Sequence, residues 1–217
     1  DQLIDFFDVK EVSWNRSYEP WIVKRDKDLK TYLKCKVNVN SCNGSLLWEP
    51  WEVLKNDGTP YKVFTPFYKR GCLSTSPPRK PISEKINFFK HNFSSMKLSD
   101  LNLLENKDWE TKILSQWNVG EDTSLEIMKS FYLNGVKDYS EGRNFPIKKN
   151  VSRLSPYLHW GQISPNILWY ELQNLKNVRE NDIEVFKSEL GWREFAYYLL
   201  YHFPYLQKKN LKSNFDN

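Results

Sequence analysis

Residues 151–165, VSRLSPYLHWGQISP, and residues 189–204, ELGWREFAYYLLYHFP, predict that the C-terminal part of this chain is helical. In the first stretch, Ser155-Pro156 and Ser164-Pro165 each place a hydroxyl before a proline. This pattern is typical of a helix start with a side-chain cap, because a proline at the first helical position has no N–H that needs a partner. The second stretch has no proline before its last residue, so we expect a helix from about residue 183 to 201.

Upstream of these stretches the composition and the spacing of apolar residues change twice along the sequence. Residues 121–132 carry a helical stripe of apolar side chains, whereas prolines and basic residues interrupt residues 71–120, which indicates a linker. Residues 9–14 alternate like a strand, and residues 26–33 have helical spacing. We therefore predict a predominantly helical chain in three parts: α/β material in residues 1–70, a linker in 71–120 and an all-helical part in 121–217.

Composition narrows the class of protein. The 217 residues carry a formal net charge of +5, which allows a polyanionic partner without requiring one. The three cysteines form no CxxC motif and the three histidines lie far apart, so we expect neither a disulfide framework nor a metal site. No apolar run is long enough for a membrane span and no secretory signal is visible, so we expect a reduced, cytoplasmic protein. The chain opens at Asp1, without a methionine, which favours a piece of a longer protein.

The segment VSRLS, residues 151–155, is the first candidate site. Two hydroxyls, a guanidinium and free N–H groups at a helix start converge there, and a phosphate requires such groups. A serine-capped helix start is also common where no ligand binds. On these residues alone, the ordinary cap is the commoner explanation.

The second candidate site lies on the predicted last helix. Glu189, Trp192, Arg193 and Ala196 stand at positions i, i+3, i+4 and i+7, so they share one helix face. Such a face is either an ion pair shielded by an indole or the wall of a polar pocket that accepts a flat ligand. Periodicity alone does not separate these two interpretations.

Taken together, the two stretches closely resemble the flavin-binding helical domain of the DNA photolyase/cryptochrome family. WNRSYEPW, NGSLLWEPWEV, GTPYKVFTPFYKRG and GRNFP resemble the same family in the same order, so the resemblance covers essentially the whole chain. It implies that residues 1–70 are the last part of an α/β antenna domain, and that residues 121–217 are the first part of an all-α FAD-binding domain after an interdomain linker. The family's opening strand and everything after the WREF helix have no counterpart here, so we expect the chain alone to hold FAD weakly.

The resemblance also assigns roles to single residues. Glu189 matches the carboxyl that hydrogen-bonds a pyrimidine dimer and Trp192 the indole that packs against it, so these two are the catalytic candidates. Arg143 matches a basic residue near the DNA backbone, and Arg193 would lie between flavin and lesion. The implied DNA-binding set is Arg143, Glu189, Trp192 and Arg193. The implied FAD-binding set is Tyr139, Val151, Ser152, Arg153, Leu154, Ser155, Phe186, Glu189, Trp192 and Arg193, in which Val151 replaces the usual threonine and leaves only backbone contacts.

The activity implied by the resemblance is light-driven repair of cyclobutane pyrimidine dimers by a class I type photolyase. Reduced FAD donates an electron to the dimer, the cyclobutane ring splits, and the electron returns. A dimer flipped out of the duplex needs an aromatic wall and hydrogen bonds at its polar edge. The expected partner is damaged DNA, bound by a monomer, and a second antenna chromophore of the folate or deazaflavin type would accompany FAD. The alternatives are a cryptochrome that signals without repair and a helical DNA-binding or scaffold module without catalysis.

Overall fold

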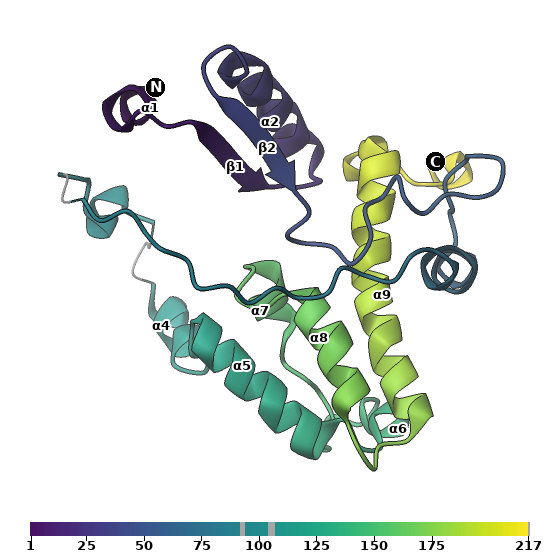
Figure 1. Ribbon diagram of the computed structural model, residues 1–217. Coiled ribbons are helices and arrows are strands. Elements are labelled where there is room, and N and C mark those ends of the chain that lie inside the picture. Colours follow the sequence, from purple (N-terminus) through teal and green to yellow (C-terminus); the bar gives the residue numbers. More distant parts are fainter. Residues whose placement is uncertain (92–93, 104–106, 217) are drawn as a thin grey trace.

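The computed structural model describes residues 1–91, 94–103 and 107–216, and Figure 1 shows its arrangement. A small unit of two strands and one long helix lies beside a group of helices that contains the long helix α9. Residues 75–91 form an extended segment without helix or strand. The sequence prediction of an α/β part followed by a predominantly helical part is confirmed.

The α/β part is a parallel strand–helix–strand unit that follows the short helix α1 (Gln2–Phe7). Strand β1 (Glu11–Asn15) pairs in parallel with β2 (Asn38–Cys42), and α2 (Pro20–Leu33) connects them. Parallel strands require such a crossover, because the chain leaves the first strand at one end of the sheet and must enter the second strand at the other end. The strand at 9–14 and the helix at 26–33 were predicted, whereas β2 was not, because its sequence, NVNSC, is mostly polar.

The long helix α9 spans Glu180–His202 and includes the predicted range 183–201. Its last residues precede Phe203-Pro204, where the proline prevents continuation. The other α-helices in the described part of the chain are α3 (Phe64–Pro66), α4 (Asp108–Leu114), α5 (Glu121–Ser130), α6 (Tyr139–Gly142), α7 (Ser155–His159) and α8 (Pro165–Glu171). Short turns of π-helix (Phe67–Gly71, Phe131–Gly135) and 3-10 helix (Cys72–Ser74, Leu98–Leu101, Leu172–Asn174, Pro204–Gln207, Ser213–Phe215) complete the helical structure.

The two predicted serine caps have different outcomes. Ser164 caps α8, since its Oγ accepts the N–H of Asn166 at 3.2 Å and Pro165 is the first helical residue. The predicted cap at Ser155 is wrong: α7 already includes Ser155, its N-cap is Leu154, and no side chain caps it. The reason is backbone geometry, because an N-cap residue is normally extended, as Ser164 is, whereas Leu154 has φ −89° and ψ −9°.

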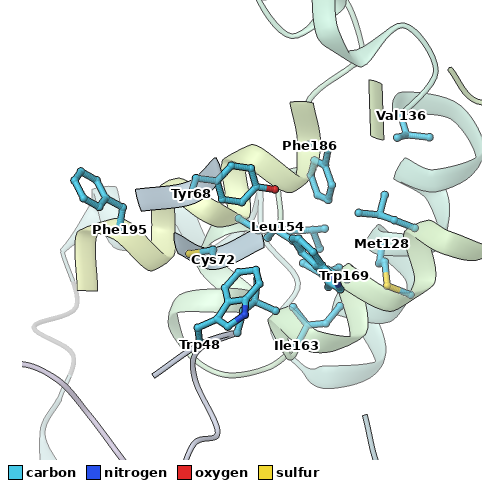
Figure 2. Packing of buried hydrophobic residues seen from close by; sticks show 14 of the residues in the cluster. Trp48, Tyr68, Cys72, Met128, Val136, Leu154, Ile163, Trp169, Phe186 and Phe195 are labelled. Atoms are coloured by element: carbon cyan, nitrogen blue, oxygen red, sulfur yellow. The ribbon is translucent and has the colours of Figure 1, made fainter. Parts of the chain in front are cut away.

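One hydrophobic core joins α9 to a segment far upstream of it. Figure 2 shows Trp48, Tyr68 and Cys72 beside Trp169 and Phe186. The buried residues of this cluster that precede residue 73 are Leu47, Trp48, Val53, Phe67, Tyr68 and Cys72. The strand–helix–strand unit therefore ends at Cys42, and residues 47–72 share the core of the helices, although the expected division placed them with the α/β part up to residue 70.

One close approach in this core is at Gly191, where α9 meets the ring of Tyr68. A Cβ at Gly191 would lie 2.6 and 2.7 Å from two ring carbons of Tyr68, which is buried and stacked on Phe64 at 5.5 Å. We expect Gly191→Ala to lower the free energy of unfolding by about 1 kcal/mol, because overpacking of a rigid ring costs about 2 kcal/mol, the middle of its usual range, whereas the helix-propensity gain is about 1 kcal/mol. Urea unfolding measures the change. Ala196→Ser, at an exposed position of the same helix, is the control, and an equally stable Gly191→Ala protein would contradict the argument.

Candidate functional site

A cleft of about 430 Å³ lies between α6, α7 and α9. Seven of the predicted site residues line it: Tyr139, Ser152, Leu154, Ser155, Phe186, Glu189 and Arg193. Leu158, His159, Leu190 and Tyr197 complete the lining. The residues from α9 recur at helical spacing, so a single helix supplies one continuous wall of the cleft.

Aromatic rings form the apolar part of this wall. The rings of Tyr139 and Phe186 meet edge to face at 5.3 Å, and Phe131 packs against Phe186 at 4.9 Å. All three side chains are buried, and burial raises the pKa of Tyr139, so its hydroxyl stays neutral at physiological pH. Such a wall suits a flat ring system, because offset and edge-on aromatic contacts are favourable.

An ion pair lies at the rim of the cleft. The Arg143 guanidinium donates a hydrogen bond to a carboxylate oxygen of Glu189, and it also lies over the ring of Tyr139 at 5.5 Å. The hydrogen bond to Glu189 raises the pKa of Arg143, and both side chains are about one-third exposed. The structure therefore joins a predicted DNA-backbone residue to a predicted catalytic carboxylate, which the sequence analysis had treated separately.

The buried carboxylate of Glu194 fixes the position of the Arg193 side chain. Its Nη1 donates to the carbonyl oxygen of Ser45 at 2.7 Å and to Oε1 of Glu194 at 3.0 Å. Glu194 is 2% exposed and also accepts the N–H groups of Leu47 at 2.7 Å and Trp48 at 3.4 Å. Glu194 was not among the predicted site residues. Its spacing indicated burial, since Glu194 stands four residues after Leu190 and four before Tyr198, both of which are buried.

Glu194 should make the stability of the fold depend on pH. Burial raises the pKa of Glu194 to about 7, against the opposing effects of Arg193 and the two N–H groups. Between about pH 4.5 and 7 the folded chain keeps this proton while the unfolded chain loses it, so the free energy of unfolding should fall as the pH rises through this window. One pKa unit corresponds to about 1.4 kcal/mol, which is the largest slope per pH unit that one residue gives. Urea unfolding at several pH values measures the slope, and Glu194→Gln should make it shallower; an unchanged slope in this variant would contradict the assignment.

Trp192 lies outside the cleft. Its indole stacks on the ring of Phe64 with a centroid distance of 3.8 Å and an angle of 12°, and 49% of the side chain is exposed. Glu189 and Arg193 line the cleft without it. Trp192 and Arg193 are neighbours in the sequence, so their side chains leave the helix about 100° apart. The predicted common face of Glu189, Trp192 and Arg193 is therefore divided. Contact of Trp192 with a flavin or a lesion stays a prediction.

The predicted phosphate segment is divided between two hollows. Ser152 lines the cleft and also a neighbouring hollow of about 700 Å³, which Val151 and Arg153 line without reaching the cleft. Arg153 has a left-handed backbone, with φ 54°, and its guanidinium lies 4.4 Å from the ring centre of Trp117. Phosphate binding by residues 151–155 stays a prediction.

The cleft fits the chemistry of a flavin. A flavin ring is flat and apolar on its faces and carries hydrogen-bonding groups at its edge, and the cleft offers aromatic faces beside a carboxylate, a guanidinium and two hydroxyls. Among residues 1–91, 94–103 and 107–216, no three His, Cys, Asp or Glu side chains gather in a way that could hold a metal ion. Nor does any helix within these ranges have the length and apolar character needed to cross a membrane.

Comparisons with known proteins indicate the family of the chain. Residues 1–84 match the model of the family described as DNA photolyase. The chain is 39% identical over 210 residues to a deoxyribodipyrimidine photo-lyase of Agrobacterium fabrum, covering 94% of this chain and 44% of the relative, and 26% identical to cryptochrome-2 of Arabidopsis thaliana, covering 94% and 36%. The crystal structure of a bacterial class III photolyase from Agrobacterium tumefaciens superimposes with a TM-score of 0.85 at 37% identity, covering 99% of this chain and 45% of that one.

The chain spans less than half the length of the two curated relatives named above. The solved relative is described as class III, so the comparisons do not support the expected class I type. Photolyases and cryptochromes both appear among the matches, and both cover almost the whole chain. The fold, the cleft and these matches together show that the chain belongs to the DNA photolyase/cryptochrome family.

Proposed function

We propose that this chain serves the light-driven repair of cyclobutane pyrimidine dimers in DNA, with FAD as the cofactor. The observation that carries the proposal is the cleft itself, in which Tyr139, Phe186, Glu189 and Arg193 meet. Two relatives support the reaction, because they are described as a deoxyribodipyrimidine photo-lyase and a photolyase. The net charge of +5 is compatible with a polyanionic partner.

In the proposed complex the cleft would hold the flavin. Tyr139 and Phe186 would pack against its ring system, while the carboxylate of Glu189 and the guanidinium of Arg193 would hydrogen-bond its polar groups. Ser152 lies where the two hollows meet and contacts the phosphates. When bound, the reduced cofactor would supply the electron after it absorbs light. The protein would position the cofactor and the lesion and would exclude water.

The lesion would approach from the rim of the cleft. Glu189 accepts hydrogen bonds from the dimer, and Arg143 neutralises this carboxylate and contacts a phosphate. The exposed face of Trp192 stacks against the flipped bases, while Phe64 supports its other face. These side chains position and polarise the dimer, and none of them acts as a hydrolytic acid.

The test is made on the full-length gene product, because the chain spans only 44% of the Agrobacterium fabrum relative. The purified protein is mixed with an oligonucleotide that contains one pyrimidine dimer, illuminated with blue light, and the remaining dimers are counted. We expect their loss in the light with reduced flavin and no loss in the dark. A flavin-loaded protein that leaves all dimers intact under illumination would refute the proposal.

The match to cryptochrome-2 supports one alternative, a blue-light signalling flavoprotein without repair. Such a protein would bind FAD in the same cleft but would have no preference for damaged DNA. Binding titrations with damaged and undamaged oligonucleotides at one salt concentration separate the two functions. A second, antenna chromophore stays a prediction under either of them.

A further inference from the structure

A buried carboxylate at the start of α9 holds the short helix α6. Asp182 is fully buried, and its two carboxylate oxygens accept the N–H groups of Asp138 at 3.1 Å and Ser140 at 2.8 Å. Arg179 donates from Nε at 2.9 Å and from Nη2 at 3.3 Å, and it also pairs with the side chain of Asp138 at 3.1 Å. Asp182 therefore lies at the centre of a network that joins two helices.

Helix α6 depends on this network because it has no cap of its own. It is a single turn, Tyr139–Gly142, and its N-cap residue Asp138 has φ 60° and makes no side-chain cap bond. The first N–H groups of a helix have no partner inside the helix and must find one elsewhere. The N–H of Tyr139 donates to the carbonyl oxygen of Val136, whereas Asp182, more than 40 residues away in the sequence, supplies the partner for the N–H of Ser140 and for that of the N-cap residue Asp138.

The turn that Asp182 caps carries two residues of the cleft. Tyr139 lies between the two capped N–H groups and packs edge-on against Phe186. Arg143 follows the turn directly and pairs with Glu189. A shift of α6 would therefore move an aromatic wall of the cleft and release the carboxylate at its rim.

We propose that Asp182 is a positioning residue for the flavin cleft, acting through the turn Tyr139–Gly142. Its capping bonds fix the ring of Tyr139 and, through Arg143, the carboxylate of Glu189. The role in flavin binding rests on the proposed function, whereas the capping itself does not. Burial opposes ionisation of Asp182, but the bonds from Arg179 and Ser140 outweigh it and hold the pKa at about 2, so the cap stays charged at physiological pH.

The first measurement is amide hydrogen exchange at Asp138 and Ser140, which requires no cofactor. In Asp182→Ala we expect exchange to be about tenfold faster or more at these two amides, with a smaller change in Asp182→Asn, which keeps one acceptor oxygen. Glu180→Gln is the matched control, since Glu180 is an exposed acid in the same first turn of α9. Unchanged exchange in Asp182→Ala would overturn the proposal, and Asp182→Asn provides the same test where the alanine variant does not fold.

The second measurement is the dissociation constant of FAD from the full-length gene product. We expect it to rise about tenfold in Asp182→Ala, less in Asp182→Asn and not at all in Glu180→Gln. Faster exchange together with unchanged FAD affinity would overturn the positioning role. A wild-type protein that binds no FAD would instead overturn the proposed function and with it the flavin role of Asp182, while faster exchange would still show the cap.

Discussion

Replacing Glu194 by alanine should lower the free energy of unfolding by about 1–3 kcal/mol, the typical cost of leaving a buried hydrogen-bond donor without its acceptor. Glu194 is the only acceptor found for the buried N–H of Leu47 among the described residues, and it also accepts from Trp48 and Arg193. The alanine variant leaves those donors without this acceptor in a region that excludes water. It also removes one of the contacts between α9 and residues 45–48, the other being the hydrogen bond from Arg193 to Ser45.

Urea unfolding at constant pH measures this loss. Glu180→Ala is a suitable control, because Glu180 is exposed on the same helix and its removal should change stability by less than about 0.5 kcal/mol. Glu194→Gln should lie between the two, since it keeps the shape and one acceptor oxygen. A loss below about 1 kcal/mol in Glu194→Ala would show that Glu194 does not hold these segments together.

In the proposed repair reaction, Trp192→Ala should reduce the preference for dimer-containing over intact DNA by about ten- to a hundredfold. Stacking of one base on an aromatic ring is worth about 1–3 kcal/mol, and about half of the Trp192 side chain is exposed while its ring stacks on Phe64. Phosphate contacts hold any sequence, so binding of intact DNA should change little. Trp192→Phe should keep most of the preference, because phenylalanine offers a smaller ring in the same place.

The measurement is a pair of binding titrations with damaged and undamaged oligonucleotides at one salt concentration. Trp160→Ala is the control, since Trp160 is an exposed tryptophan outside α9. If Trp160→Ala and Trp192→Ala lowered the preference equally, the stacking role of Trp192 would be refuted. Equal binding of both oligonucleotides by the wild-type protein would refute the repair proposal itself and favour the signalling function.

Glu189 gives a companion measurement in the same system. Glu189→Gln keeps the shape and one acceptor oxygen but removes the charge that pairs with Arg143. It should therefore lower the number of dimers repaired per absorbed photon more than it lowers lesion binding. Equal losses in both quantities would mean that Glu189 contributes to binding alone.

The local order of the chain was predictable from the sequence alone. The helix from 183 to 201, the capped start of α8 at Ser164-Pro165 and the strand near residues 9–14 depend on neighbours within a few positions. The motifs at 151–165 and 189–204 indicated the family for the same reason, because a motif is a local string of residues. The polar strand β2 was missed, since its partner β1 lies 27 residues upstream and its own pattern is weak.

The composition of the site was decided only by tertiary structure. The pairing of Glu194 with Leu47 joins residues 147 positions apart, and the cap of α6 by Asp182 and the pair of Arg143 with Glu189 join residues more than 40 positions apart. The separation of Trp192 from the cleft likewise follows from its stack on Phe64. Helical periodicity fixes which side chains point the same way along one helix, but the partner that covers each side is set by packing between distant segments, and no local pattern encodes that packing.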